Sequence, residues 1–132
     1  MLIKPKKSLG QNFLIDKNII KKIVSISKIS NKDVLEIGPG TGNLTEYILR
    51  EKPSKIFLIE KDKILYDQLQ LKFQNNIEIR NEDILKVNEK NISKKKLIVF
   101  GNLPYNISTK IVCNWVLKSV SYTHLTLPTT TI

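Results

Sequence analysis

The sequence is poor in several residue types, and each shortage excludes a class of protein. Cys113 is the only cysteine among 132 residues, so no disulfide can form within the chain, which suits a reducing cytoplasm. No apolar run approaches the roughly 20 residues that a membrane-spanning helix needs, and the first residues lack the apolar segment of a signal peptide. No metal site is predicted. With 41% hydrophobic and 26% charged residues, the composition is typical of a globular chain with one core.

Acidic residues are also scarce, since 12 Asp and Glu stand against 22 Lys and Arg, which gives a net charge of +10. Between Met1 and Lys28 the sequence has seven lysines and one acid, Asp16. A basic arm at one end of a chain favours a polyanionic partner, nucleic acid before a membrane surface. A lysine-rich proteome gives the same composition, so the charge alone leaves both explanations open.

The apolar residues that are present predict alternating helices and strands. An amphipathic pattern predicts a first helix over 16–29, with Asp16 as its N-cap. Four strands and three further helices are expected after it: strands at 33–37, 55–60, 76–83 and 97–100, and helices over 43–50, after Asp62 and over 108–118. Strands that alternate with helices in this way indicate an α/β fold with a parallel sheet and right-handed crossovers.

Such sheets bind ligands at the carboxyl ends of their strands, and polar features follow all four predicted strands. The first strand runs into a glycine loop at 38–42, and Glu60 ends the second. Asp83 follows the third strand and Asn102 follows the fourth. We therefore expect a ligand site at this edge of the sheet.

The segment Glu36 to Gly42 (EIGPGTG) contains the glycine loop, whose backbone can approach a ligand closely. A tight turn would use the same glycines. A dinucleotide site is one alternative, but its G-x-G-x-x-G spacing is one residue longer and places a pyrophosphate at a helix N-terminus. Glu36 beside the loop is awkward for a pyrophosphate and suits a cationic ligand, while Glu60 suits ribose hydroxyls in either case. Together with Asp83, these acids favour S-adenosylmethionine, which has a positive sulfonium and no phosphate.

The segment Asn102-Leu103-Pro104-Tyr105 reads either as a turn or as a site for an adenine amine. The Asn102 amide oxygen and a backbone carbonyl at Leu103 or Pro104 can accept the two N–H groups of the amine, which points the nitrogen lone pair at a methyl group. Pro104 removes a competing donor, and Tyr105 offers a face on which a flipped base can stack. We predict these four residues as the catalytic set.

Between Lys4 and Lys118 the sequence resembles the KsgA family of small-subunit ribosomal RNA adenine dimethyltransferases. The shared segments are KKSLGQNFL (6–14), LEIGPGTGNLT (35–45), IEKD (59–62), EDIL (82–85) and GNLPYNIST (101–109). The glycine loop occurs in many methyltransferases, whereas SLGQNFL joined to NLPYNIS is specific to this family and to its erythromycin-resistance relatives, which act on large-subunit RNA.

The resemblance implies a Rossmann-like, S-adenosylmethionine-dependent methyltransferase fold. It also implies a cytoplasmic monomer, without a membrane partner, that dimethylates adenine amines of small-subunit (16S) ribosomal RNA during subunit maturation. By motif match, Asn12 and Leu14 lie against the cofactor and the basic arm faces RNA. The other implied cofactor contacts are the Gly38 backbone, Glu60 on the ribose hydroxyls, Asp83 on the cofactor's adenine amine, and Asn102 where cofactor meets target base. A large-subunit RNA substrate and a non-catalytic RNA-binding assembly factor stay open as alternatives.

The resemblance ends at Lys118, beyond which the composition changes. Threonine occurs five times from Thr123 onward and three times before it, and no Lys, Arg, Asp or Glu follows Lys118. We therefore predict that residues 1–118, with the basic arm and lead-in helix at 1–30, are the N-terminal part of a methyltransferase domain. Residues 119–132, which include His124, are predicted to be a non-native or disordered tail. Since the family continues with more strands and a helical domain, we expect a truncated, inactive fragment with strand order 3-2-1-4 and an unpaired outer edge.

Overall fold

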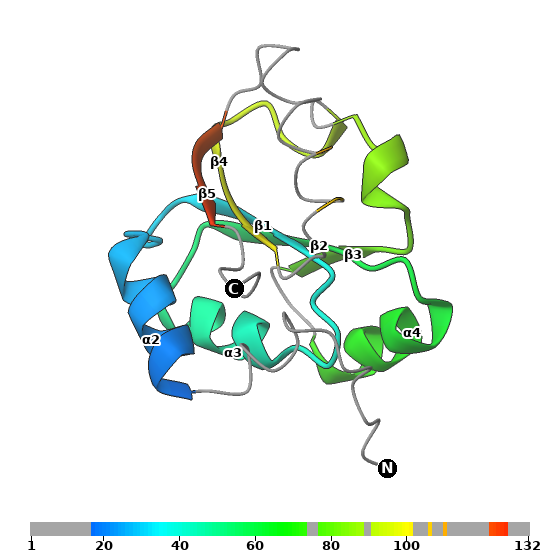
Figure 1. The fold of residues 1–132 in the computed structure, drawn as a ribbon, viewed down its shortest axis with the longest axis horizontal. Helices are drawn as coiled ribbons and strands as arrows, with labels where there is room; N and C mark the ends of the chain where they lie inside the picture. The colour runs from blue at the N-terminus through cyan, green and yellow to red at the C-terminus, as the bar shows by residue number, and fades with distance from the viewer. Residues whose placement is uncertain are drawn as a thin grey trace.

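The computed structural model of the protein describes residues 17–73, 77–88, 91–101, 106, 110 and 122–126. These residues form a parallel sheet of five strands in the order β3-β2-β1-β4-β5 (Figure 1). The strands are β1 (Asp33–Ile37), β2 (Lys55–Ile59), β3 (Ile77–Arg80), β4 (Leu97–Gly101) and β5 (Tyr122–Thr126). The helices are α2 (Lys17–Ile26), α3 (Asn43–Arg50), α4 (Lys63–Lys72) and the short 3-10 helix η1 (Ile84–Lys86). The predicted α/β alternation is confirmed, while most of the helix predicted over 108–118 lies outside the described residues.

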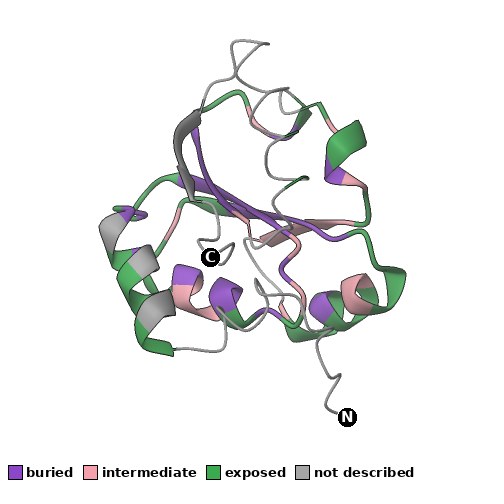
Figure 2. Ribbon diagram, viewed as in Figure 1, coloured by how far each residue is buried: buried purple, intermediate pink, exposed green. Residues whose placement is uncertain are grey.

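The three α-helices cover one face of the sheet, and η1 lies on the other side (Figure 1). Side chains alternate between the two faces along each strand, so neighbours such as Val34 and Leu35 enter different clusters. Both faces are covered, which is why β1 and most of β2 and β4 are buried without interruption (Figure 2).

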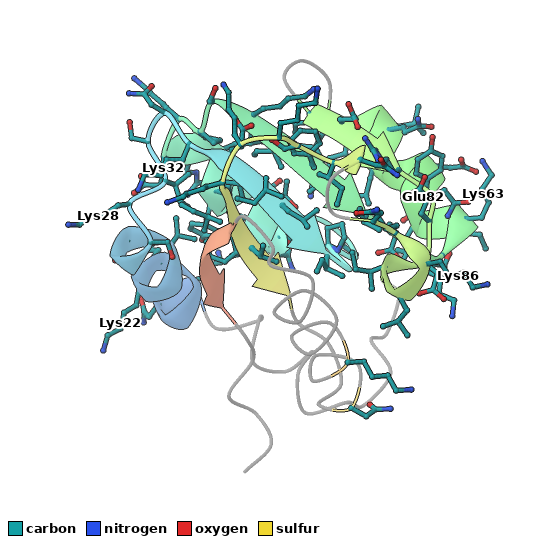
Figure 3. All side chains as sticks on the ribbon, turned by 90° about the horizontal axis from the view of Figure 1, so that it is seen from above. Lys22, Lys28, Lys32, Lys63, Glu82 and Lys86 are labelled. Atoms are coloured by element: carbon teal, nitrogen blue, oxygen red, sulfur yellow. The ribbon has the colours of Figure 1, made fainter. Side chains whose placement is uncertain are left out.

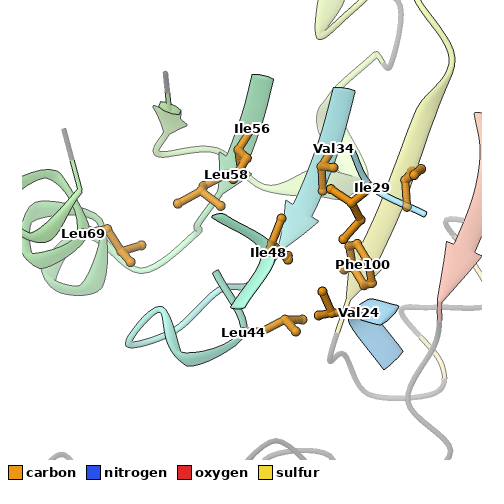
Figure 4. Close-up of a cluster of buried hydrophobic side chains, with 10 residues drawn as sticks. Val24, Ile29, Val34, Leu44, Ile48, Ile56, Leu58, Leu69 and Phe100 are labelled. Atoms are coloured by element: carbon orange, nitrogen blue, oxygen red, sulfur yellow. The ribbon is translucent and has the colours of Figure 1, made fainter. Parts of the chain in front are cut away.

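The helix-side cluster holds the α-helices against the sheet (Figure 4). Its buried members are Val24, Ile29, Val34, Leu44, Ile48, Ile56, Leu58, Leu69, Ile98 and Phe100. Asp62 begins α4 as its N-cap, because its carboxylate accepts hydrogen bonds from the backbone N–H groups of Ile64 (2.8 Å) and Leu65 (3.1 Å). The start of α4 is therefore fixed directly after β2.

The strand β5 corrects the prediction for the tail. Its backbone pairs in parallel with β4, from Leu97 opposite Tyr122 to Phe100 opposite Thr126, with a register shift between Leu97 and Ile98. The order 3-2-1-4 is present as predicted, but the expectations of an unpaired outer edge at β4 and of disorder at 122–126 are wrong. An edge strand presents free N–H and C=O groups, and an uncharged segment rich in threonine and tyrosine has the β propensity to pair with them. The non-native origin of residues 119–132 stays a prediction.

Candidate cofactor site

The parallel register brings the carboxyl ends of three neighbouring strands to one edge, which we call the cofactor edge. The backbone N–H of Gly38 donates to the Ile59 carbonyl (2.9 Å), and that of Glu60 donates to the Arg80 carbonyl (2.9 Å). The glycine loop, Glu60 and the segment 81–83 therefore leave the sheet side by side, as the sequence predicts. Gly101 at the end of β4 pairs with Ile37 on the same edge.

Some of the predicted site lies outside the described residues. The predicted cofactor contacts Asn12 and Leu14 are in this group, and so are the predicted catalytic residues Asn102, Leu103, Pro104 and Tyr105. Gly38, Glu60 and Asp83 are described, and the structure brings them to the cofactor edge.

Glu60 is the central side chain of this edge. It is 6% exposed, and each of its carboxylate oxygens accepts one backbone hydrogen bond. The N–H of Gly40 donates to Oε1 (3.1 Å) and the N–H of Asp62 donates to Oε2 (3.0 Å). A carboxylate oxygen has two acceptor positions, so each oxygen can accept one further donor. Glu60 is thus oriented to receive a pair of hydroxyl groups.

The three glycines of the loop have positive φ angles, 64° at Gly38, 61° at Gly40 and 88° at Gly42, and they serve different purposes. Among the residues that the structure describes, a Cβ built on Gly40 would meet nothing within 4 Å, so they leave this side of the loop open. A Cβ built on Gly42 would lie 2.5 Å from Cε2 of Phe73. Gly42 is therefore required by packing between the loop and α4, whereas Gly40 leaves space for a ligand.

Glu36 lies in a different place from the one that the sequence suggests. It shares a face of β1 with Val34 and points toward the helices, where Thr45 Oγ1 donates to its Oε1 (2.5 Å). The side chain is 1% exposed, and burial raises its pKa to about 7. The hydrogen bond from Thr45 lowers this pKa and the nearby carboxylate of Glu60 raises it. Glu36 therefore lies between β1 and α3, on the helix side of the glycine loop, and does not line the open side of that loop.

Asn81 is a residue that the sequence analysis missed. Its side-chain Nδ2 donates to the carbonyls of Glu60 (2.9 Å) and Lys61 (3.0 Å), which ties the exit of β3 to the exit of β2. The sequence signal was the polar stretch Asn81-Glu82-Asp83, in which nothing singles out the asparagine. Because Asn81 holds the carbonyls on both sides of Lys61, it fixes the backbone from which the Glu60 side chain extends.

Asp83 is half-buried beside this junction. Its Oδ1 accepts from the N–H of Leu85 (3.0 Å), which caps η1, and its Oδ2 lies 3.7 Å from Nζ of Lys61. Lys61 is 80% exposed, so the Oδ2 side of Asp83 faces an opening toward solvent. This oxygen is placed to accept a hydrogen bond from a ligand amine.

The arrangement suits a ligand with hydroxyl and amine groups better than one with a pyrophosphate. The carboxylate of Glu60 already occupies the N–H of Gly40, which a phosphate at this loop would need. The carboxyl group of Asp83 stands on the same edge and would repel an anion. Within the described part of the chain, no group of three or more His, Cys, Asp or Glu is arranged to hold a metal ion. Nor is any described helix long and apolar enough to cross a membrane.

Solved structures identify the class. The fold matches the crystal structure of the 23S rRNA methyltransferase ErmE with a TM-score of 0.75 and 29% identity, over 88% of this chain and 47% of that one. It matches a dimethyladenosine transferase from Plasmodium falciparum with a TM-score of 0.71 and 27% identity, over 85% of this chain and 41% of that one. The fold is that of the S-adenosylmethionine-dependent methyltransferases, as expected.

Within this class, residues 3–132 match the sequence model of the ribosomal RNA adenine dimethylase family, and the chain belongs to that family. It is 62% identical over 118 residues to the ribosomal RNA small subunit methyltransferase A of Pelagibacter ubique, covering 89% of this chain and 45% of that protein. A Wolbachia protein of the same name is 43% identical over 130 residues, covering 96% of this chain and 48% of the relative. The chain thus spans about half the length of the curated relatives that it matches.

Proposed function

We propose that the protein acts in the S-adenosylmethionine-dependent dimethylation of adenine amines in small-subunit ribosomal RNA. The placement of Glu60 is the observation that supports S-adenosylmethionine as the methyl donor. Its carboxylate accepts from the N–H groups of Gly40 and Asp62, and each oxygen keeps one acceptor position. Membership of the family supports the reaction, and the 62% identity to a small subunit methyltransferase supports the substrate.

In this proposal the described residues bind the cofactor through its adenosine. Glu60 accepts the two ribose hydroxyls, Asp83 accepts the adenine amine through Oδ2, and the Gly38 backbone contacts the cofactor. The backbone at Gly40 leaves room for close approach. Asn12 and Leu14 contribute from the basic arm. When bound, S-adenosylmethionine supplies an electrophilic methyl group on a positively charged sulfur.

The target adenine is held by the segment that follows β4. Asn102 accepts one N–H of the amine through its amide oxygen, and the carbonyl of Leu103 or Pro104 accepts the other. Tyr105 stacks on the base. These contacts direct the lone pair of the nitrogen at the methyl group, so positioning and electrostatics lower the barrier. The methylated amine loses its proton after the transfer, so no strong general base is required.

Methylation of large-subunit RNA is a second candidate, and the likeness to the 23S rRNA methyltransferase ErmE favours it. The identity to that enzyme is 29%, against 62% to a small subunit methyltransferase, so the small subunit is the better supported substrate. A non-catalytic RNA-binding factor would have no need of the Asn102–Tyr105 segment.

Transfer of labelled methyl groups to immature small subunits by the complete protein tests the proposal. Asn102→Ala should abolish the transfer, while Asn91→Ala, an exposed asparagine before β4, should leave it unchanged. Mapping the labelled adenines identifies the substrate. Full activity of Asn102→Ala would contradict the catalytic role, and label confined to large-subunit RNA would contradict the substrate. Cofactor binding without any transfer would favour the non-catalytic factor.

A further inference from the structure

The amino ends of the strands lie opposite the cofactor edge, and several lysines gather there that have no role in the proposed reaction. They lie in the turns that precede β1, β2 and β4 and at the first position of β2, and we call them the basic edge: Lys28, Lys32, Lys52, Lys55, Lys94, Lys95 and Lys96. We propose that the basic edge is a second RNA-contact surface, which binds phosphates of the substrate RNA away from the methylated base. The identity of this RNA rests on the proposed function.

The strand register places these lysines together. Asp33 pairs with Lys55 on one side and with Leu97 on the other, so Lys32 and Lys96 each directly precede a paired position on neighbouring strands. Two hydrogen bonds join the first two turns: the N–H of Asn31 donates to the Lys52 carbonyl (3.1 Å), and the N–H of Ser54 donates to the Lys32 carbonyl (2.8 Å). Adjacent strands are about 4.8 Å apart, so the three turns form one continuous surface.

The basic edge and the cofactor edge lie at opposite ends of the molecule. Lys28 and Lys32 lie at one end, and Lys63, Glu82 and Lys86 lie at the other (Figure 3). An RNA that contacts both ends would extend along the sheet.

The charge of the basic edge is largely uncompensated. All seven lysines are exposed, and Lys55 alone among them forms an ion pair within the described residues, with Glu78 at 3.4 Å. By contrast, Lys61, Lys63 and Lys72 each have an acidic partner. Three described acids lie near the basic edge: Asp33 is buried and accepts from Ser93, Glu78 is also bound by Arg80, and the exposed Glu51 precedes Lys52. The seven lysines outnumber these acids. Such a surface attracts a polyanion.

The backbone at this edge gives a second, independent reason. In the described part of the chain, the only non-glycine residues with positive φ are Lys28 (48°), Asn31 (62°) and Lys52 (54°), all in these turns. Lys28 follows α2 and Lys52 follows α3, where glycine is the usual residue because it adopts this conformation without strain. Two lysines therefore stand where glycine would stabilise the fold, which favours a role in binding over a role in folding.

The chemistry of the surface favours nucleic acid over a protein or a membrane. The hot spots of protein interfaces are mostly large aromatic or apolar side chains, and amphipathic segments that lie in a membrane surface insert apolar residues. The exposed large hydrophobic residues of the described chain are Ile64, Leu71 and Leu85, which belong to α4 and the η1 region and not to the basic edge. Lysines separated by Ser30, Asn31 and Ser54 instead offer point charges and small polar groups, which suit a phosphate backbone.

The test uses the double variant Lys28→Gly, Lys52→Gly. Glycine relieves the positive-φ strain, so the Tm should equal or exceed that of the unmodified chain while RNA affinity falls. Each lost phosphate contact lowers the slope of log K against log salt by about 0.7 for single-stranded RNA, or about fivefold in affinity at 0.1 M salt. We therefore expect about 25-fold weaker binding of a small-subunit ribosomal RNA fragment and unchanged S-adenosylmethionine binding.

The control is Lys63→Gln, Lys72→Gln, which removes the same charge from α4. Both lysines already pair with acids, Asp67 and Glu46, so their loss should weaken RNA binding about threefold or less. Equal losses in both double variants would reduce the effect to net charge and overturn the inference. Unchanged affinity of Lys28→Gly, Lys52→Gly would overturn it as well. If Lys28→Gly, Lys52→Gly is unstable, the triple variant Lys94→Gln, Lys95→Gln, Lys96→Gln tests the basic edge instead. Weaker RNA binding at an unchanged Tm would support the proposal, and unchanged RNA binding would refute it. Failure of the unmodified protein to bind small-subunit RNA would contradict the proposed function itself.

Discussion

Replacing Glu36 by glutamine should change how the stability of the protein depends on pH. Glu36 is 1% exposed, and Thr45 Oγ1 donates to its Oε1. Glutamine has nearly the same shape and keeps an oxygen that accepts this hydrogen bond, but it cannot ionise. The substitution therefore removes one titrating group and leaves the packing between β1 and α3 in place.

The size of the effect follows from the pKa of Glu36 in the two states. Burial raises this pKa to about 7 in the folded protein, from 4.5 for an exposed glutamate. The folded state therefore holds the proton more tightly. The resulting stabilisation is fully present below pH 4.5 and is lost as the pH rises through 7. One pKa unit corresponds to 1.36 kcal/mol, so the total change in the free energy of unfolding is about 3 kcal/mol.

Urea unfolding of both proteins between pH 4 and pH 8.5 measures this change. The difference in the free energy of unfolding, unmodified protein minus Glu36→Gln, isolates Glu36, because all other titrating groups occur in both proteins. We expect this difference to fall by about 3 kcal/mol across the range, most steeply between pH 4.5 and 7. Thr45→Val removes the hydrogen bond that lowers the pKa of Glu36, so it should move the upper limit of the fall to higher pH.

A difference that stays constant across this pH range would refute the reasoning, since it would mean that Glu36 ionises as readily in the folded protein as in the unfolded chain. A difference that rises with pH would mean that a nearby donor or cation stabilises the carboxylate.

Three further predictions concern the cofactor edge. Gly42→Ala should lower the free energy of unfolding by roughly 1–3 kcal/mol in urea titrations, because its Cβ would lie 2.5 Å from Phe73 at a φ of 88°; Gly40→Ala, without such a contact, should lose less. Asn81→Asp replaces two hydrogen bonds to the Glu60 and Lys61 carbonyls by repulsion, so it should weaken S-adenosylmethionine binding about tenfold or more in calorimetry. The control Asn91→Asp should leave this binding unchanged. Equal effects of the two substitutions would contradict a positioning role for Asn81. Glu60→Gln should weaken the same binding by roughly 1.5–3 kcal/mol, the worth of a charged hydrogen bond, and stabilisation of the unmodified protein by NAD alone would refute the choice of cofactor.

The strands were predictable because parallel strands that are buried on both faces are continuous apolar runs. The run at 33–37 ends at a glycine loop, and the run at 97–100 ends at Gly101. Glycine therefore marks the carboxyl end of each of these two strands. The position of Glu60 followed from the same reasoning, since it is the first polar residue after β2. Residues 122–126 were misjudged because their pairing depends on the free edge of β4, a feature of the assembled sheet that local composition does not contain.

Hydrogen-bond donors distinguish three acids that stand at or near the ends of neighbouring strands, Glu36, Glu60 and Asp83. Both faces of β1 are apolar, so no polar periodicity indicates that Glu36 points toward α3, where burial favours its neutral form. Glu60 is nearly as buried, but a backbone N–H group donates to each of its oxygens, and each oxygen keeps a second acceptor position. Asp83 uses one oxygen to cap η1 and leaves the other facing the exposed Lys61. In the proposed function, the supporting acid therefore differs from the two binding acids in its donors: a buried hydroxyl for Glu36, and backbone amides at the open end of the sheet for Glu60 and Asp83.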